Sequence, residues 1–405
     1  MSSTLTWLDH DSEARERSLR ILALYREKES RDELGIGSIR DALADQLFPG
    51  TSTIQTRLAY MLFVPWIYQR LESRRVPSDR IRVEAQRMEA ELVAPLVQQG
   101  DKAGQEIYGV IGRVAKSELK RFPSSIYWAG LRRWGIRRLE GSQEQYHRSV
   151  DSLYRRLASR RKRDDDEWAD EGTVSTWHPK LPDPPQGFPG TATFVMRDED
   201  ASFLSDRIQT SCAGSLLAWL VQHPNHMDCD FPWLKPDIAQ APESVRVLLE
   251  HARCFSLVMH GASLLYNLQL AGLSNLEGRV EEYRAALDEW AGTTGWSEFD
   301  RWKLDEFFNA ARDSEHAIPH ATEVFVKQWI ALAQAHQGVV AEDPSARELV
   351  RHREQALKKG RSRFTNHAAL KQWSGASGVA RLDYRWGTVK TFLADLGRVE
   401  GKSHA

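Results

Sequence analysis

The densest apolar run of the chain, Leu58 to Tyr68, most constrains what the chain can fold into. Nearly every residue in it is aliphatic or aromatic, and a helix that is apolar on all sides has to be buried. The run is too short to span a bilayer and has an arginine close to each end. We therefore expect the stretch from Phe48 to Leu71 to combine a turn, a helix start and a buried helix that is the centre of the first domain. Pro65 lacks a backbone N–H and predicts a kink or a break in it.

A turn precedes this run. Phe48-Pro49-Gly50 is a typical chain breaker, and hydroxyl residues follow it as candidate N-caps. Free backbone N–H groups and the helix dipole favour an anion at such a position. The candidate anion ligands are three hydroxyl residues and the arginine that follows them: Thr51, Ser52, Thr53 and Arg57. The alternative is ordinary capping with Arg57 paired to Asp41 or Asp45, because the spacing of a P-loop is absent.

The remaining chain shows helical rather than strand periodicity. Glu243 to Leu270 keeps a period of 3.6 residues, and no stretch with a period of two is longer than a few residues. The predicted fold class is therefore mainly α. Five prolines and an acidic block predict a linker between two helical domains. The expected parts are an N-terminal helical domain (1–163), a linker (164–192), an acidic helical domain (193–344), a basic helical C-terminal region (345–397) and a tail (398–405).

Composition places the chain among soluble proteins. It has 405 residues, of which 41% are apolar and 27% charged, which is enough for two or three domains with cores of their own. The start of the chain lacks the basic segment and the apolar stretch of a signal peptide. Three cysteines argue against a disulfide framework. We expect a cytoplasmic protein that does not contact a membrane.

Charge is unevenly distributed although the net charge is only −1. Residues 111–163 hold fifteen Lys or Arg against four Asp or Glu, and residues 193–344 hold eleven against twenty-three. Residues 345–390 again hold eleven basic residues against three acidic ones. This order suggests separate surfaces with separate partners. The alternative is that the basic and acidic segments neutralise each other within the fold.

Two basic segments are candidates for contact with DNA or RNA. In the first, aromatic residues at 127, 128 and 134 alternate with arginines, and such aromatic side chains can stack on unpaired bases. Neutralising several phosphates supplies most of the non-specific affinity for nucleic acid. The candidate ligands are Arg132, Arg133, Arg137, Arg138, Lys358, Lys359, Arg361, Arg363, Lys371 and Arg385. The alternative is that the cations are solvated helix faces and that Trp134 belongs to the core.

Catalytic and metal motifs are weak or missing. His223-x-x-His226-x-x-Cys229 offers ligand types that zinc prefers, but a loop rich in Pro, Asn and Asp gives the same spacing by chance. The chain has no Gly-x-Ser-x-Gly, no His-Glu-x-x-His and no dinucleotide fingerprint. We therefore assign no catalytic residue, no metal and no cofactor.

Several segments together resemble a bacterial family of unknown function whose members have about this length. They are WLDHDSEARERSLRILAL, RDELGIGSIRDALADQLFPGTSTIQTRLAYMLFVPWIY, IYWAGLRRWGI, RSRFTNHAALKQW and LDYRW. Families of this kind are described from mobile and phage-defence gene neighbourhoods, beside helicases, nucleases or methyltransferases. The resemblance implies a place in antiviral defence and partners from the same operon, such as a helicase or a nuclease. It implies no activity and no catalytic residues.

These observations favour a non-enzymatic subunit of a nucleic-acid-processing complex. Its basic surfaces would bind DNA or RNA, and its acidic domain would dock a protein partner, since surfaces of opposite charge speed encounter. A metal-dependent hydrolase or nuclease is one alternative. A structural scaffold without contact to nucleic acid is the other.

Overall fold

The computed structural model describes residues 32–103, 108–113, 121–161, 175–314 and 316–399. These residues are mostly helical, which confirms the predicted mainly α fold class. Within them no strand forms, and β pairing is limited to two isolated bridges, Arg137 with Trp177 and Met196 with Val399.

The chain divides into two compact units. Unit 1 consists of Met1–Leu43 and Glu250–Leu382, and unit 2 consists of Ala44–Leu249 and Asp383–Ala405. Each unit gathers segments that are far apart in the sequence, so this division differs from the contiguous ranges 1–163, 193–344 and 345–397. Two helices, α2 (Gly37–Leu47) and α10 (Glu243–Leu273), contain a boundary between the units.

Unit 2 is built on the apolar run that the sequence singled out. Its helices are α3 (Tyr60–Ser73), α4 (Ile81–Glu91), α5 (Val93–Ala103), α6 (Pro123–Arg133), α7 (Gln143–Arg161), α8 (Asp198–Ser211), α9 (Leu216–Gln222) and α17 (Trp386–Gly397), with short 3-10 turns at Pro232–Leu234 and Ile238–Gln240. All nine residues from Tyr60 to Tyr68 are buried, which confirms the expected central helix. The helix begins only at Tyr60, and it continues through Pro65.

Residues 175–192, the second part of the expected linker, pack against this helix. The indole N–H of Trp66 donates to the carbonyl of Pro182 at 2.6 Å, and the rings of Trp66 and Phe188 lie 5.3 Å apart. Trp177 is buried as well. These residues therefore belong to the folded unit, because α3 needs apolar cover on this side. Residues 164–174 of the expected linker lie outside the described residues, as do residues 400–405 of the expected tail.

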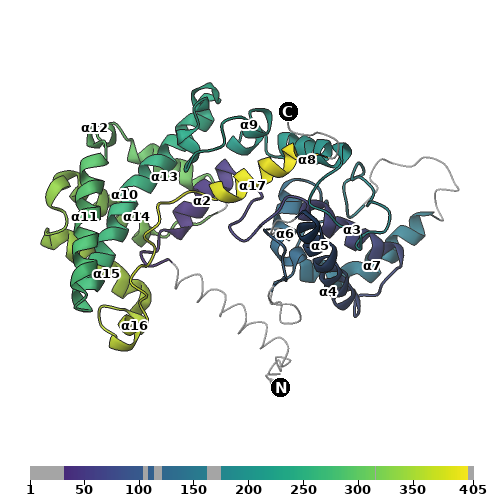
Figure 1. The fold of residues 1–405 in the computed structure, drawn as a ribbon, viewed down its shortest axis with the longest axis horizontal. Helices are drawn as coiled ribbons and strands as arrows, with labels where there is room; N and C mark the ends of the chain where they lie inside the picture. The colour runs from purple at the N-terminus through teal and green to yellow at the C-terminus, as the bar shows by residue number, and fades with distance from the viewer. Residues whose placement is uncertain (1–31, 104–107, 114–120, 162–174, 315, 400–405) are drawn as a thin grey trace, which may run out of the picture. The chain divides into compact units, whose positions relative to one another are not determined.

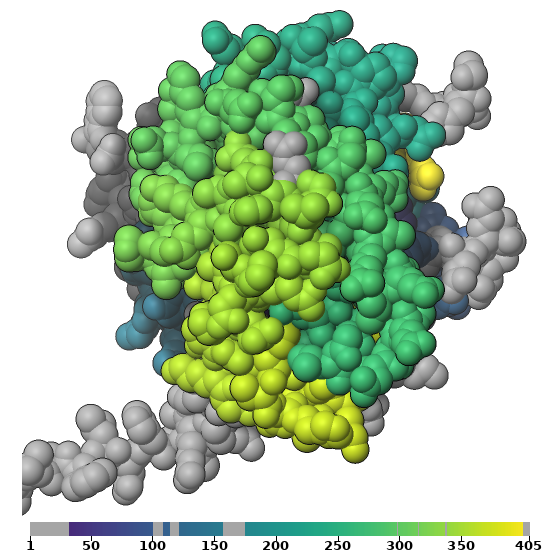
Figure 2. Space-filling model, turned by 90° about the vertical axis from the view of Figure 1, so that its left-hand side faces the viewer, coloured from purple at the N-terminus to yellow at the C-terminus, as the bar shows by residue number. Residues whose placement is uncertain are grey.

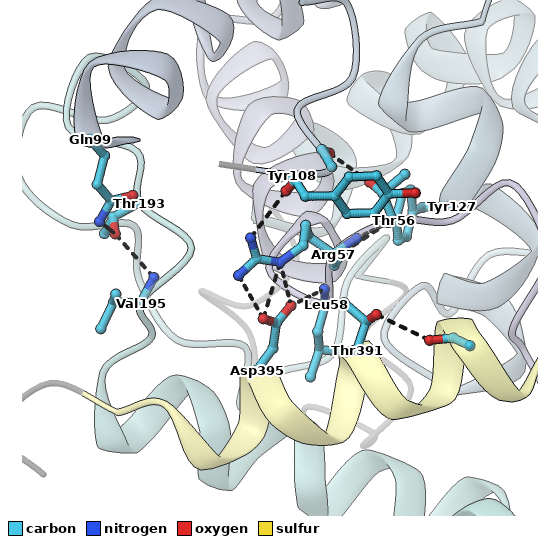
Figure 3. Close-up of polar contacts among 12 residues, drawn as sticks. Thr56, Arg57, Leu58, Gln99, Tyr108, Tyr127, Thr193, Val195, Thr391 and Asp395 are labelled. Carbon is cyan, nitrogen blue, oxygen red and sulfur yellow. Dashed lines mark hydrogen bonds and ion pairs between the residues drawn. The ribbon is translucent and has the colours of Figure 1, made fainter. Parts of the chain in front are cut away.

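A buried ion pair attaches α17 to the start of α3 (Figure 3). The Asp395 carboxylate accepts from Arg57 Nε at 3.1 and 3.0 Å, from a terminal guanidinium nitrogen at 2.6 Å and from the Leu58 N–H at 2.9 Å. The Arg57 guanidinium also lies 4.1 Å from the centre of the Phe194 ring. Its backbone is held by Tyr127, whose hydroxyl donates to the Arg57 carbonyl at 2.8 Å.

Unit 1 packs its helices around α10. They are α11 (Glu277–Thr293), α12 (Trp296–Phe299), α13 (Leu304–Arg312), α14 (His320–Ala335), α15 (Pro344–Lys358) and α16 (His367–Lys371), with 3-10 turns at Gln337–Val339 and Lys359–Arg361. The indole N–H groups of Trp290 and Trp329 donate to the carbonyls of Leu257 and Val258, each at 2.8 Å. In Figure 2 the yellow-green segment of α15 and α16 lies directly against the green segments that precede it. Of the expected basic region 345–397, residues 345–382 thus fall in unit 1, and its last helix, α17, falls in unit 2.

Removal of one partner of the buried pair gives the first test. We predict that Asp395→Ala lowers the free energy of unfolding by about 3–5 kcal/mol, because it leaves the Arg57 guanidinium buried and unpaired. The matched control is Asp206→Ala, whose carboxylate is 59% exposed where it pairs with Arg207. We expect that change to cost at most about 1 kcal/mol. Urea denaturation of both variants measures the difference, and equal losses would contradict the prediction.

Candidate nucleic-acid interface

The predicted anion ligands at 51–57 face the chain itself. The Thr51 hydroxyl donates to the Phe48 carbonyl at 2.7 Å, and the Ser52 N–H donates to the Gln55 side chain at 2.9 Å. Thr53 is exposed. Since α3 begins at Tyr60, none of the three hydroxyl residues caps it. The anion that Arg57 binds is the carboxylate of Asp395, rather than an external phosphate or the expected alternatives Asp41 and Asp45.

The predicted arginines at the end of α6 divide into one internal and three exposed residues. Arg137 is buried, donates to the carbonyls of Trp128 and Leu139, and lies 4.7 Å from the Trp128 ring. Burial lowers its pKa to about 10, so the group stays charged at neutral pH. The exposed residues are Arg132, Arg133 and Arg138. Trp128 and Trp134 are buried and cannot stack on a base.

In the C-terminal set, two of the predicted cations bind an acid of their own unit. The Glu33 carboxylate is 3.2 Å from Lys358 Nζ and 2.7 Å from an Arg363 guanidinium nitrogen, and all three groups are largely buried. Arg363 also donates to the Tyr266 hydroxyl at 3.0 Å. These two residues therefore hold the segment before α2 against the end of α15.

The other predicted cations differ in their surroundings. Lys359, Arg361 and Lys371 are exposed in unit 1. Arg385, in unit 2, pairs with Asp45 and donates to the Thr51 carbonyl at 2.7 Å. The structure thus brings the predicted residues together only in part, and it uses four of them, Arg137, Lys358, Arg363 and Arg385, to hold the fold.

A basic surface that the sequence analysis missed lies where α3 ends. Figure 1 shows α3, α4 and α7 next to one another in unit 2. The turn from α3 to α4 carries the exposed residues Arg74, Arg75 and Arg82, none of which has an acidic partner among the described residues. We call residues 74–82 the arginine turn. Arg70, in the last turn of α3, is exposed beside it.

Two carboxylates near the arginine turn are bonded to neutral groups rather than to its arginines. Asp151 of α7 accepts from the Ser78 N–H at 3.1 Å and from the Ser78 hydroxyl at 2.5 Å. Glu72 accepts from the Tyr146 hydroxyl and from the Trp177 indole at 3.3 Å. Burial raises the pKa of Glu72. Neither acid is therefore paired with Arg74, Arg75 or Arg82. Of the other charged residues of the turn, Arg80 is 3.5 Å from Glu84, and Asp79 is exposed.

The backbone of the turn is fixed in a Schellman motif. The Val76 N–H donates to the Leu71 carbonyl at 3.1 Å, and the Arg75 N–H donates to the Glu72 carbonyl at 2.9 Å. Arg75 has a φ of 51°, at the position where glycine is usual because a left-handed residue with a Cβ is strained. The Tyr154 hydroxyl donates to the Val76 carbonyl at 3.0 Å, which fastens the turn to α7. In the sequence this turn is indicated by Arg74-Arg75 ahead of Val76-Pro77, with no glycine at the end of the helix.

A buried polar network lies under α3 and α6. Glu89 accepts from the Ser124 N–H at 2.7 Å, and its second carboxylate oxygen has no partner. Gln143 donates to the Ser124 and Tyr68 hydroxyls, each at 2.7 Å, and Tyr68 is 2.8 Å from His147 Nε2. Burial raises the pKa of Glu89 to about 7 and lowers the pKa of His147 to about 4. The network can therefore hold a proton on a core carboxyl group near neutral pH.

The candidate zinc ligands do not assemble. His223 Nδ1 is 2.9 Å from the Trp219 carbonyl, and the imidazole stacks on that indole at 4.3 Å. The thiol residue Cys229 offers its carbonyl to the Trp386 indole and to Lys390. Across the described part of the chain, no group of three or more His, Cys, Asp or Glu residues is placed to hold a metal ion.

Comparison with known proteins identifies a family. Residues 1–400 match a family described as a family of unknown function, DUF6361. The chain belongs to this family. A search of curated proteins and a search of solved structures each gave no match. The predicted resemblance to a family of unknown function is thus confirmed for this DUF6361 member.

Among its described helices, none has the length and apolar character needed to cross a membrane.

The buried cluster of Glu33, Lys358 and Arg363 gives the second test, which compares the stability of two double variants. Lys358→Gln with Arg363→Gln should lower the free energy of unfolding by about 3–5 kcal/mol, because Glu33 would stay buried without a counterion. The control pair, Lys359→Gln with Arg361→Gln, removes the same charge from exposed positions and should change it by about 0.5 kcal/mol or less. Thermal melting of the two double variants separates them. Equal effects would show that the buried cluster does not stabilise unit 1.

Glu89 predicts a pH-dependent stability. The unfolded carboxyl group loses its proton near pH 4.5 and the folded one near pH 7, so ionisation disfavours the folded state between these values. His147 has the opposite effect. Its pKa is about 4 in the folded state and 6.5 in the unfolded state, so the folded state gains stability as the pH rises between these values. The difference between Glu89→Gln and the unchanged protein isolates Glu89, and we expect it to grow by about 3 kcal/mol in favour of the variant from pH 4.5 to 7.5. The exposed Glu91→Gln on the same helix is the control. A constant difference over this range would contradict the prediction.

Proposed function

We propose that this DUF6361 member binds nucleic acid through the arginine turn of unit 2. One observation carries the proposal: three exposed guanidinium groups without acidic partners stand on a backbone that is already fixed, while Asp151 and Glu72 are bonded to neutral groups. Arginine recognises phosphate through paired, charge-assisted hydrogen bonds. Because the turn is held before any ligand arrives, little ordering entropy opposes binding.

A second group of cations in the same unit supports the proposal. Arg138 and His178 are brought together by short backbone hydrogen bonds, from the Arg138 N–H to the Thr176 carbonyl and from the His178 N–H to the Ile136 carbonyl, both at 2.8 Å. Burial lowers the pKa of His178, the charges of Arg207, Arg138 and Lys180 lower it further, and Asp206, the ion-pair partner of Arg207, opposes them. Lys180 is exposed beside it. This group would extend the contact to a longer stretch of nucleic acid.

The wider role that we propose is a non-enzymatic subunit of a nucleic-acid-processing complex in bacterial antiviral defence. A protein partner, such as a helicase or nuclease, would dock on the acidic side of unit 1. Helix α11 supports that part of the proposal, because several of its exposed acids have no ion-pair partner among the described residues. They are Glu277, Glu281, Asp288 and Glu289.

Arg75→Gly tests the arginine turn. Glycine relieves the left-handed strain of about 1–2 kcal/mol but adds unfolded-chain entropy, so stability should stay constant or rise by up to about 1 kcal/mol. Affinity for an oligonucleotide should nevertheless fall, and the dependence of log affinity on log salt should lose about 0.7 (single strand) or 0.9 (duplex) for one lost phosphate contact. Fluorescence anisotropy over a salt series, with a melting curve for each protein, measures both quantities.

Asn275→Gly is a matched control from unit 1. Asn275 has a φ of 53°, and the same pair of hydrogen bonds closes its Schellman motif: Asn275 N–H to the Gly272 carbonyl and Leu276 N–H to the Ala271 carbonyl, both at 3.1 Å. This change should have a similar effect on stability and none on binding. The proposal fails if the unchanged protein binds neither single strands nor duplex at low salt. It also fails if the Arg75→Gly variant binds as tightly as the unchanged protein.

A further inference from the structure

A hollow of about 480 Å³ adjoins the arginine turn. This volume is within the range of about 300–1,000 Å³ that is usual for small-molecule sites. One wall is the face of α3 that ends at the turn, and the other is the proline-rich segment 183–188. The lining residues of α3 are Trp66, Gln69, Arg70 and Ser73. Since Ser73 precedes Arg74 directly, a group in the hollow is one residue away from the cations of the turn.

The proline-rich wall is held firmly in place. Arg70 donates to the Phe188 carbonyl, and Arg197 donates to the Asp183 carbonyl at 2.7 Å. The Thr191 hydroxyl donates to the Gln186 carbonyl at 2.9 Å, and the Phe188 N–H donates to the Pro185 carbonyl at 3.1 Å. The hollow is therefore formed without a ligand, and its occupant does not have to order it.

Two polar groups of the hollow have unused hydrogen-bonding capacity. The side chains of Gln69 and Asp183 have no hydrogen-bond or ion-pair partner among the described residues, and Asp183 is exposed. An amide can donate and accept, whereas a carboxylate can only accept. Beside them, Pro184 and Pro185 supply apolar surface, and the buried rings of Trp66 and Phe188 reach the hollow only at their edges. The hollow thus combines apolar walls with an acceptor that suits an amino group.

We propose that this hollow takes an unpaired nucleobase of a single strand whose phosphates lie on the arginine turn. The inference rests on the proposed function and deepens it by naming the strand state. Proteins recognise single strands by stacking splayed bases on aromatic side chains or arginine planes while cations follow the backbone, and Arg70 lines this hollow. A base inside a duplex is paired and stacked, so it does not reach a hollow of this kind. Cytosine, adenine and guanine carry an exocyclic amine that can donate to Asp183, whereas an unpaired thymine offers only its single N3–H.

Ser73→Leu is the test, because it fills the hollow and leaves every arginine in place. Its affinity for a single-stranded oligonucleotide should fall about tenfold, the effect of losing one bound base, while affinity for duplex of the same sequence stays unchanged. The matched control is Ser125→Leu on α6. Both serines are exposed and donate to the carbonyl three residues earlier, at 2.9 Å in Ser73 and 2.8 Å in Ser125. Anisotropy titrations measure the affinity of each variant, Ser73→Leu and Ser125→Leu, for the single strand and for the duplex.

Base composition gives a second readout. The unchanged protein should bind oligo-dC several-fold more tightly than oligo-dT, and Asp183→Asn should remove most of that preference, because an amide oxygen is a weaker acceptor than a carboxylate.

The outcomes separate the two proposals. If Arg75→Gly weakens binding but Ser73→Leu does not, the arginine turn binds nucleic acid and the hollow takes no base. If Ser73→Leu weakens single-strand and duplex binding equally, the inference is overturned as well, because the change acts through the turn. If the unchanged protein binds neither form at low salt, both proposals fail.

Discussion

Unit 2 depends on one constraint: a helix that is apolar on every side has to be covered on every side. Tyr60 lies against the rings of Tyr127 and Phe194, and Phe63 lies against Phe188. Further along α3, Tyr68 contacts Trp128 and Trp177. No neighbouring stretch of sequence could supply so much cover, so α6 and the segment 177–196 are both required. This is why residues that look like a linker by composition are part of the core.

The sequence predicted the elements that depend on local pattern. The burial of α3 and the long helix α10 follow from apolar residues at helical spacing, and the structure has both. The start of α3 was placed too early, because a breaker followed by hydroxyl residues resembles a cap. Instead, these residues form a turn, in which the Thr51 hydroxyl donates to the Phe48 carbonyl and the Ser52 N–H donates to the Gln55 side chain. Local pattern therefore predicts that a helix exists better than it predicts where the helix begins.

Counts of charge could not predict which cations are free. The excess of basic residues between 345 and 390 includes Lys358 and Arg363, but the carboxylate that neutralises them is Glu33, more than 300 positions earlier. Arg57 and Asp395 are separated by 338 positions. The arginine turn was missed for the opposite reason: Glu72 and Asp151 count as neutralising charges in the sequence, yet the fold bonds both to neutral groups. Whether a cation is paired depends on where the acidic side chains point and how deeply they are buried. Both depend on the fold and cannot be counted from the sequence.

One physical effect could explain arginines at the end of α3 without any ligand. The carboxyl end of a helix carries a partial negative charge, which favours a nearby cation by about 0.3–1 kcal/mol and is screened by salt. That is sufficient reason for Arg70, which has helical geometry and sits in the last turn. It is too small for Arg75, because a left-handed residue with a Cβ costs about 1–2 kcal/mol where glycine would cost little. Asn275 at the corresponding position of α10 follows the usual preference, since asparagine tolerates this conformation. The helix dipole therefore leaves the strain at Arg75 unexplained, and the binding role that we propose for its guanidinium group would account for it.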